Sequence, residues 1–150
     1  NPSESVRNLP ALDSTATTDV TISTAKILII DDEPFNITFC QKLLRDLGYV
    51  NCLGQTDSSR AMVTILAERP DLIILDVMMP VLSGVDLLRL IRDHDELSHI
   101  PVLILTASSD RTTKATVLEL GATDLLAKPI DVSELSPRVK NSLTLKRYHD

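Results

Sequence analysis

The sequence is poor in aromatic residues and in cysteine. Its 150 residues include no tryptophan, two tyrosines, two phenylalanines and two cysteines. A folded core must therefore consist mainly of aliphatic side chains. Cys40 and Cys52 are too few for a disulfide framework and lack the spacing of metal ligands, which predicts a protein of the reducing cytoplasm.

Long apolar runs and a positive net charge are also absent. No apolar run approaches the ~20 residues of a membrane-spanning helix, and no signal peptide precedes the first apolar run. A net charge of −6 argues against direct binding of nucleic acid or of an anionic membrane by this segment. With 43% hydrophobic and 24% charged residues, the composition is that of an ordinary soluble domain.

The two ends of the chain differ from its middle. Residues 1–24 are rich in Ser, Thr, Asp and Pro without periodicity, which predicts a flexible leader or linker. A short strand at Val20–Ile22 is the alternative. We expect one domain over residues 25–145. Residues 146–150 either extend its last helix or begin a linker to an output domain beyond residue 150.

Short apolar runs alternate with segments of helical periodicity. The predicted strands are Lys26–Ile30, Tyr49–Gly54, Leu72–Leu75, Pro101–Leu105 and Leu125–Ala127. Because the central runs are continuously apolar, we expect strands covered on both faces. The alternation predicts an α/β fold: a flavodoxin-like (βα)5 doubly wound parallel sheet of five strands in the order 2-1-3-4-5, with helices on both faces.

The predicted helices have recognisable starts and apolar faces. Pro34 opens the first, Ser58 or Ser59 caps the second, Ser83-Gly84 leads the third and Asp110 opens the fourth. Helical spacing predicts an apolar face on each of four helices: Phe35, Phe39, Leu43 and Leu47, with Cys40 and Leu44 beside them, on the first; Ala61, Met62, Ile65 and Leu66 on the second; Ala115, Leu118 and Leu120 on the fourth; and Leu135, Val139 and Leu143 on the last. We expect the last helix to start between Asp131 and Ser136, and its regular part to begin no earlier than Glu134, because Pro137 would break a hydrogen bond deep in a helix.

Polar residues stand where four of the five strands end. Asp31 and Asp32 follow the first strand, Asp76 the third, Thr106 the fourth and Lys128 the fifth. In a parallel sheet these ends meet at one edge, so three carboxylates would crowd together and repel. A divalent cation such as Mg²⁺ resolves the repulsion and leaves positions open for a phosphoryl oxygen. Taken singly, each residue also has an ordinary explanation as a helix cap, a turn residue or a solvated side chain.

The strand-end residues stand within longer motifs. Asp31-Asp32 follows Ile-Leu-Ile-Ile, Asp76 begins Asp-Val-Met-Met-Pro-Val-Leu-Ser-Gly, Thr106-Ala107 follows Pro-Val-Leu-Ile-Leu, and Lys128-Pro129 comes shortly after Gly121-Ala-Thr-Asp. In this order and spacing, the chain resembles the receiver domains of two-component response regulators over roughly residues 26–145. Members of that family accept a phosphoryl group on aspartate from a sensor histidine kinase or a histidine phosphotransfer protein.

The resemblance implies a role for each of these residues. Asp76 would be the phosphoacceptor, with Thr106, Ala107 and Lys128 acting on the phosphoryl group. Asp32 would bind Mg²⁺ directly and Asp31 through water, while Asp76 and the backbone carbonyl of Met78 complete the protein ligands; Mn²⁺ is an alternative ion. The Lys128–Pro129 peptide bond would be cis. The domain would act as a switch, through the surface of its fourth helix, fifth strand and fifth helix, rather than as an enzyme with turnover. A homodimer is a common state of such relatives.

Two departures from the family pattern bear on the switch. Leu125 occupies the place, three residues before the lysine, where relatives usually have an aromatic residue whose rotation accompanies that of the threonine. Met78 stands two residues after the phosphoacceptor, and Ser108 stands two residues after the threonine. Neither is an acid or amide suited to orient the water that attacks the acyl phosphate. We therefore predict slow self-dephosphorylation.

Other classes of protein explain the sequence less well. The Asp-x-Asp signature of haloacid-dehalogenase phosphatases is absent from the first strand, and acids after that strand would repel the phosphate of a flavin. The Gly-rich motif of nucleotide-binding P-loops is missing. The strongest alternative is a receiver-fold interaction module that works without phosphorylation, although the loss of Asp76 or Lys128 that usually accompanies this role is not seen.

Overall fold

The computed structural model describes residues 24–107 and 110–149. Its elements are, in chain order, β1 Lys26–Ile30, α2 Pro34–Asp46, β2 Asn51–Gln55, the 3₁₀ turn η1 Ser58–Arg60, α3 Ala61–Glu68, β3 Leu72–Asp76, α4 Gly84–Asp93, β4 Val102–Ala107, α5 Arg111–Glu119, β5 Asp124–Lys128 and α6 Val132–His149. The predicted leader and the alternative strand at Val20–Ile22 lie outside the described residues, except for Thr24. In the part that is described, no helix is long and apolar enough to cross a membrane.

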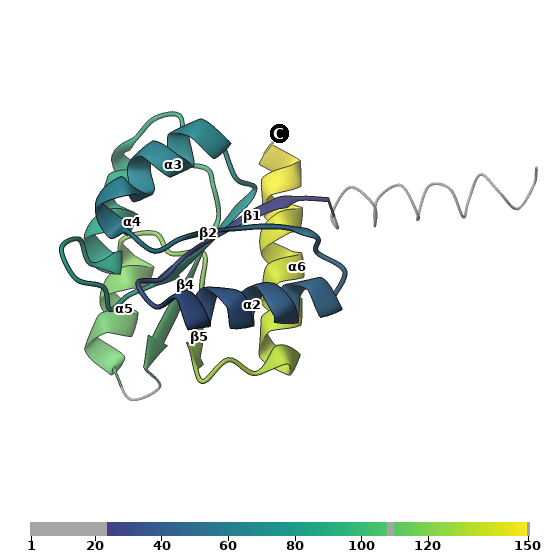
Figure 1. Cartoon of the computed structure of the whole chain (residues 1–150). Helices are drawn as coiled ribbons and strands as arrows, with labels where there is room; N and C mark the ends of the chain where they lie inside the picture. Colours follow the sequence, from purple (N-terminus) through teal and green to yellow (C-terminus); the bar gives the residue numbers. More distant parts are fainter. Residues whose placement is uncertain (1–23, 108–109, 150) are drawn as a thin grey trace, which may run out of the picture.

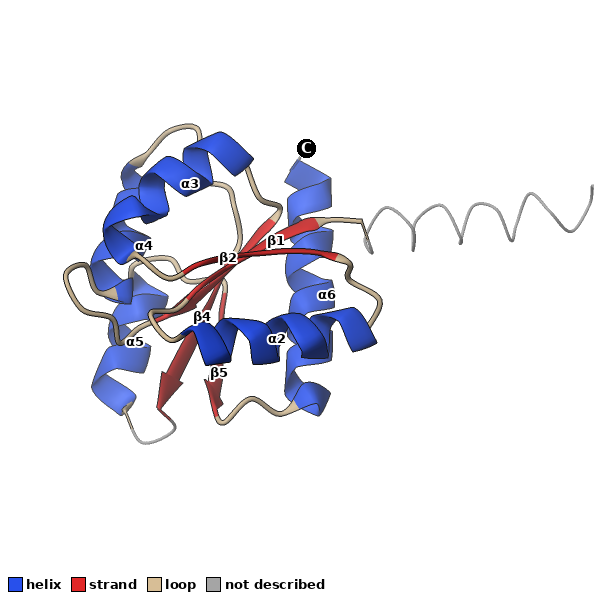
Figure 2. Ribbon diagram, in the orientation of Figure 1, coloured by secondary structure: helices blue, strands red, loops and turns tan. Residues whose placement is uncertain are grey.

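The five strands form one parallel sheet in the order β2-β1-β3-β4-β5. The predicted fold class and strand order are therefore confirmed. Figure 2 shows the sheet between two layers of helices. Because β1 pairs with both β2 and β3, the strand order reverses beside β1. The carboxyl ends of β1 and β3 flank the crevice that this reversal creates.

The core lies in two layers, one on each face of the sheet. Alternate strand residues, such as Ile29 and Ile74, pack with α2 and α6. Their neighbours, such as Ile30 and Ile73, pack with α3, α4 and α5. Figure 1 shows α2 and α6 covering one face and α3 to α5 the other. Tyr49 is the only aromatic side chain among the buried hydrophobic residues described, so the prediction of an aliphatic core is confirmed.

The regular part of α6 begins earlier than predicted. The helix begins at Val132, two residues before Glu134, and Pro137 lies inside it. The Asp131 carboxylate accepts hydrogen bonds from the Ser133 amide and hydroxyl, and the Asp131 carbonyl accepts one from the Leu135 amide. Pro137 removes the hydrogen bond that would end on the Ser133 carbonyl, and because Ser133 is exposed water can satisfy that oxygen. The predicted inward face of Leu135, Val139 and Leu143 is confirmed.

Two predicted helix faces are wrong in part. On α5 the buried residue is Val117, whereas Ala115 is exposed and Leu118 is 50% exposed. The helix contains apolar residues on two faces. At its start, the Thr113 amide donates a capping hydrogen bond to the Asp110 carboxylate. On α2, Ile37, Cys40 and Leu44 are buried, which leaves both phenylalanines on the outside.

The cap of the second helical segment is also different from the prediction. Asp57, rather than Ser58 or Ser59, caps it by accepting a hydrogen bond from the Ser59 amide. Ser58 is instead buried and directs its hydroxyl to a different loop. The predicted face of Ala61 and Ile65 is nevertheless buried. The sheet and the two core layers therefore hold the strand ends in place, while the loops around them are fixed both by contacts within a loop and by contacts between loops.

Candidate functional site

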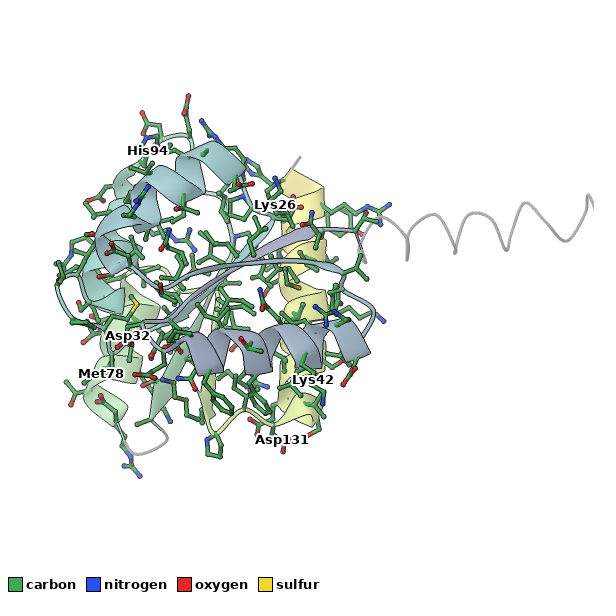
Figure 3. All side chains as sticks on the ribbon, viewed as in Figure 1. Lys26, Asp32, Lys42, Met78, His94 and Asp131 are labelled. Carbon is green, nitrogen blue, oxygen red and sulfur yellow. The ribbon has the colours of Figure 1, made fainter. Side chains whose placement is uncertain are left out.

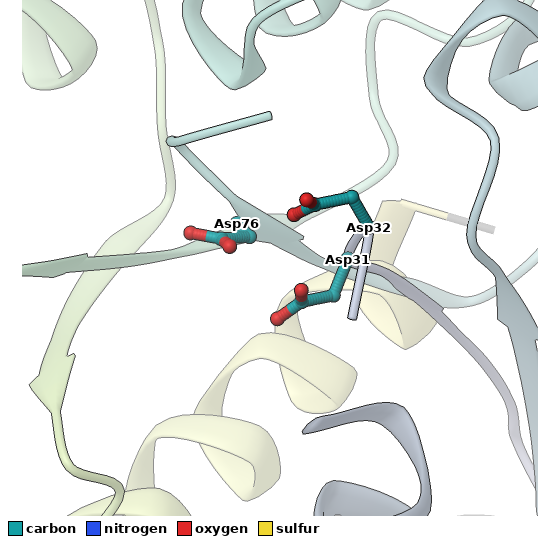
Figure 4. Close-up of side chains that lie close together, drawn as sticks. All are labelled: Asp31, Asp32 and Asp76. Carbon is teal, nitrogen blue, oxygen red and sulfur yellow. The ribbon is translucent and has the colours of Figure 1, made fainter. Parts of the chain in front are cut away.

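Three carboxylates meet at the carboxyl edge of the sheet. Asp31 and Asp32 follow β1, and Asp76 ends β3; each offers a carboxylate oxygen within 4.8 Å of the other two. Asp31 and Asp76 are buried and Asp32 is partly exposed. Figure 4 shows the three side chains side by side, and Figure 3 places Asp32 near Met78 at this edge. The predicted crowding of acids is therefore present.

The β1 to α2 connection fixes Asp31. The Asp31 amide donates to the carbonyl of Gln55 over 3.2 Å, which continues the pairing of β1 with β2. The Asp31 Oδ1 atom accepts a hydrogen bond from the Glu33 amide at 2.9 Å. Pro34 then begins α2 at a position where its missing N–H costs nothing. The carboxylate is thus held by its own loop and faces inward.

Asp76 is fixed by the sheet and by the loop that follows it. The amide of Val77 donates to Leu105 on β4 over 3.1 Å, and the Met78 amide donates to the Asp76 carboxylate over 3.2 Å. Gly84 closes the loop, since its amide donates to Val77 and a Cβ there would lie 2.6 Å from the Val77 Cα. Only glycine allows this close approach, which explains its place in the motif.

Lys128 faces Asp76 from the end of β5. Its Nζ lies 2.8 Å from Oδ1 of Asp76, whose side chain is almost fully buried. The Lys128–Pro129 bond is cis, as the resemblance implied. A charge-assisted contact at this distance places a cation beside the acid that would receive a phosphoryl group.

Thr106 and Ala107 end β4 between these groups. Thr106 pairs with Ala127 and Ala107 with Lys128 across the β4–β5 ladder. The Thr106 side chain is buried, and within residues 24–107 and 110–149 its hydroxyl has no hydrogen-bond partner. A buried hydroxyl without a partner is unusual in proteins and calls for an explanation. Ala107 is exposed. Ser108 lies outside the described residues.

The electrostatics of the site favour a cation. Burial, the largest cause, together with the charge of Asp76 raises the pKa of Asp31, although the hydrogen bond from Glu33 opposes the shift. The Oδ2 atom of Asp31 is buried and has no hydrogen-bond partner in the part of the chain that the structure describes. Two carboxylates and a third at the rim form an all-oxygen donor set suited to Mg²⁺. The donor set and the unpartnered Asp31 oxygen therefore fit this ion.

A cavity that the sequence did not predict opens beside the acids. It has a volume of about 440 Å³ and is lined by Asp31, Phe35, Phe39, Lys128 and Ile130, among others. Phe35 is 75% exposed and stacks on Phe39, with ring centroids 6.4 Å apart. The sequence signal was the i, i+4 spacing of two phenylalanines directly after the acids. Their exposure could not be known before the helix was placed.

The fold and the site define a doubly wound α/β protein with an acidic, lysine-paired pocket at the strand ends. Residues 27–140 match the family described as the response regulator receiver domain. The chain belongs to this family. The predicted resemblance to receiver domains is therefore confirmed. The chain contains a receiver domain of two-component signalling, which is a signalling domain.

Two curated relatives illustrate the range of the family. The chain is 38% identical over 115 residues to the alkaline phosphatase synthesis transcriptional regulatory protein PhoP of Bacillus subtilis, covering 77% of this chain and 47% of PhoP. It is 35% identical over 130 residues to a probable cyclic di-GMP phosphodiesterase of Vibrio cholerae, covering 86% of this chain and 29% of that protein. The chain thus spans about half or less of the length of these curated relatives.

A solved structure shows the same fold with a metal ion. The receiver domain of the sensor histidine kinase PA1611 from Pseudomonas aeruginosa, described with a magnesium ion coordinated in the active site cleft, superposes with a TM-score of 0.73 and 30% identity. The alignment covers 81% of this chain and 98% of that one. The likeness therefore extends over nearly the whole receiver domain.

Proposed function

We propose that this domain accepts a phosphoryl group on Asp76, in a Mg²⁺-dependent transfer from a sensor histidine kinase or a histidine phosphotransfer protein. The observation that carries the proposal is a pair of buried oxygens, Asp31 Oδ2 and the Thr106 hydroxyl, which have no hydrogen-bond partner among the described residues and lie at the same edge of the sheet as the Lys128–Asp76 ion pair. A site with a free acceptor, a free donor and a nearby cation fits both a metal ion and a phosphoryl group. The magnesium described for the related kinase receiver supports the choice of ion.

Different residues of the chain hold the metal ion and accept the phosphoryl group. Asp32 and Asp76 would hold the ion together with the backbone carbonyl of Met78, and Asp31 would do so largely through water; Mn²⁺ would serve in place of Mg²⁺. When bound, the ion neutralises the carboxylates and the charge of the phosphoryl oxygens. An Asp76 oxygen forms the bond to phosphorus while the bond between phosphorus and the donor's imidazole nitrogen breaks, and the donor leaves as a histidine side chain.

The residues of β4 and β5 act on the transferred group. Lys128 exchanges its contact with Asp76 for one with the phosphoryl oxygens. The Thr106 hydroxyl donates a hydrogen bond to one of these oxygens, and the end of β4 at Ala107 borders the group. Such preorganised donors stabilise the charge that develops during transfer without further rearrangement.

The consequence of phosphorylation is a change of the surface formed by α5, β5 and α6. These elements are the fourth helix, fifth strand and fifth helix of the domain, and β5 is directly paired with the strand that ends in Thr106. α6 continues to His149, which suits a connection to an output domain after residue 150. Homodimerisation through this surface is part of the same proposal, as is a cytoplasmic location, which the two free cysteines fit.

The test uses the full chain with Mg²⁺ and a small phosphodonor. Incubation with acetyl phosphate is expected to add one phosphate, detected by intact mass, and beryllofluoride is expected to bind in its place. Asp76→Asn should abolish both. Asp57→Asn is the matched control, because Asp57 is an exposed acid whose capping role asparagine can keep.

The outcomes separate the proposal from a phosphorylation-independent interaction module. Phosphate incorporation that survives Asp76→Asn would place the acceptor elsewhere. A folded wild-type chain that takes up neither phosphate nor beryllofluoride in Mg²⁺ would favour the interaction module instead.

A further inference from the structure

The loop between β3 and α4 contains a backbone conformation that its sequence does not favour. Val81 has a φ of 69°, in the left-handed region where β-branched residues are rarely found. The Leu82 amide donates to the Pro80 carbonyl over 2.8 Å. The three residues therefore form a γ-turn with a positive central φ, which is the rare and strained form.

The side chain of Val81 does not explain why the turn persists. It is 89% exposed, so packing does not compensate for the strain. A strained conformation persists only where its surroundings hold it in place. The contact that holds this turn must therefore come from its backbone.

Ser58 supplies that contact from a loop on the other side of the site. Its hydroxyl donates to the Pro80 carbonyl over 2.8 Å and accepts a hydrogen bond from the Leu82 amide over 3.2 Å. One hydroxyl thus bonds to both ends of the turn. Ser58 is 4% exposed, so these bonds are shielded from competing water.

The turn belongs to the loop that follows the phosphoacceptor. At the base of the loop, the Gly84 amide donates to the Val77 carbonyl over 3.0 Å. Next to the base, Met78 donates its amide to Asp76. The loop is therefore fixed at its base by Gly84 and at its tip by Ser58, and Met78 lies between the two.

We infer that Ser58 is a positioning residue of the phosphoacceptor site. Its buried hydroxyl holds the strained Pro80–Leu82 turn and thereby keeps the Met78 backbone where its carbonyl can bind the metal ion. The inference rests on the proposed function, and it adds a residue that acts through the loop and touches neither the ion nor the phosphoryl group. A merely structural role for Ser58 would lower stability without changing metal affinity in the folded chain.

The experiment measures Mg²⁺ affinity in the full chain by calorimetry and the rate of labelling by acetyl phosphate as Mg²⁺ is varied. Losing one buried hydrogen-bonding hydroxyl is expected to weaken Mg²⁺ binding by about tenfold in Ser58→Ala. The maximal labelling rate at saturating Mg²⁺ should change by less than about twofold, because Asp76 and Lys128 are untouched. Ser59→Ala is the matched control, since Ser59 is exposed and bonds only within its own turn.

A second substitution tests the strain itself. Glycine adopts a positive φ without steric cost, so Val81→Gly should make the turn independent of Ser58. In the Val81→Gly background, Ser58→Ala is expected to change Mg²⁺ affinity by less than about threefold. If Ser58→Ala alone does not fold, Val81→Gly alone still gives a test: it should raise the midpoint of urea unfolding and leave Mg²⁺ affinity within about twofold.

The results distinguish this inference from the proposed function. A wild-type chain that binds no Mg²⁺ overturns both. A wild-type chain that binds Mg²⁺ and takes phosphate, together with a folded Ser58→Ala variant of unchanged affinity, overturns only the role of Ser58. An equal loss of affinity with and without Val81→Gly, or a lower unfolding midpoint for Val81→Gly alone, overturns the role of strain.

Discussion

Removing the Asp31 carboxylate should stabilise the metal-free chain. The side chain is buried, lies within 4.8 Å of oxygens from Asp32 and Asp76, and has a raised pKa because of burial and the charge of Asp76. Asparagine keeps the acceptor for the Glu33 amide and removes the charge. We therefore expect Asp31→Asn to raise stability in a chelator and to weaken the stabilisation that Mg²⁺ provides.

The size of the effect follows from the distances. Two unit charges 4.8 Å apart repel by about 3.5 kcal/mol at an effective dielectric constant of about 20. Lys128, 2.8 Å from Asp76, offsets part of this repulsion, and the desolvation of Asp31 adds to the cost. A net gain of about 1–2 kcal/mol is expected, which corresponds to a rise of about 2–8 °C in the unfolding temperature for a chain of this length.

The gain should depend on pH in a defined direction. The pKa of Asp31 in the folded chain lies above its ordinary value of 3.8. Below pH 3.8 the carboxyl is protonated in both the folded and the unfolded chain, and it therefore contributes nothing to the difference in stability. As pH rises through the raised pKa, the unfolded chain releases its proton more readily, so the folded wild type loses stability relative to Asp31→Asn. The difference between the two chains should reach its full size at neutral pH.

Urea unfolding in EDTA, followed by circular dichroism between pH 3.5 and about 7, measures this difference directly. Glu33→Gln is the control: it removes an exposed acid from the same loop, and its effect should stay within about 0.5 kcal/mol. The reasoning is refuted if Asp31→Asn lowers the stability of the metal-free chain, or if Mg²⁺ stabilises this variant as strongly as the wild type.

Four further substitutions test the site from other directions. Gly84→Ala should destabilise the chain by about 3 kcal/mol or more, because the added Cβ would collide with backbone of the Asp76 loop; an unchanged urea midpoint would contradict the close approach. Phe35→Ala and Phe39→Ala should slow transfer from a protein phosphodonor by about tenfold and leave acetyl phosphate labelling unchanged, since the exposed aromatic pair borders the cavity at the acids. Val63→Ala, an exposed residue of α3, is the control, and equal losses with both donors would argue against a docking role. The phosphorylated wild type should keep its phosphate for minutes or longer, and Met78→Asn, at a side chain that is 72% exposed, should shorten that lifetime; a wild-type half-life of seconds refutes this.

The sheet and the acidic cluster could be predicted because they depend on the simplest patterns. An uninterrupted apolar run such as Leu72–Leu75 indicates a strand covered on both faces, and all four of its residues are fully buried. Once parallel strands alternate with helices, their carboxyl ends must meet at one edge. The proximity of Asp31 to Asp76 follows from that topology and needs no knowledge of side-chain packing.

The remaining features depend on choices that periodicity cannot make. α5 contains apolar residues on opposite faces, and only packing against α4 and β4 selected Val117 over Leu118. The Ser58 hydroxyl could cap a helix or form a hydrogen bond with a residue distant in the sequence. In the structure its partner is Pro80, which is 22 residues away. In each case the sequence offered a plausible local role, and the tertiary contact prevailed over it.

Leu125 changes how a signal can leave the site. In the structure it is partly buried and packs with the cluster beneath α3, α4 and α5. A leucine has no hydroxyl that must find a partner, so its rotamer is set by packing alone, whereas a tyrosine at that place would couple rotation to a hydrogen bond. A response of Leu125 to Thr106 would therefore pass through contacts between aliphatic side chains.

The acids and the strained turn are unfavourable features at the same edge of the sheet. Asp31 and Asp76 repel, and Val81 adopts a disfavoured φ, yet each lies next to a strand whose residues are almost fully buried. The core fixes the strand ends, so the edge cannot relax by moving the acids apart. A ligand that neutralises the carboxylates binds the folded chain and not the unfolded one, and its binding energy therefore adds to the stability of the fold. The proposed metal binding would therefore be linked to the geometry of the loop after Asp76 and to the stability of the chain through the same few contacts.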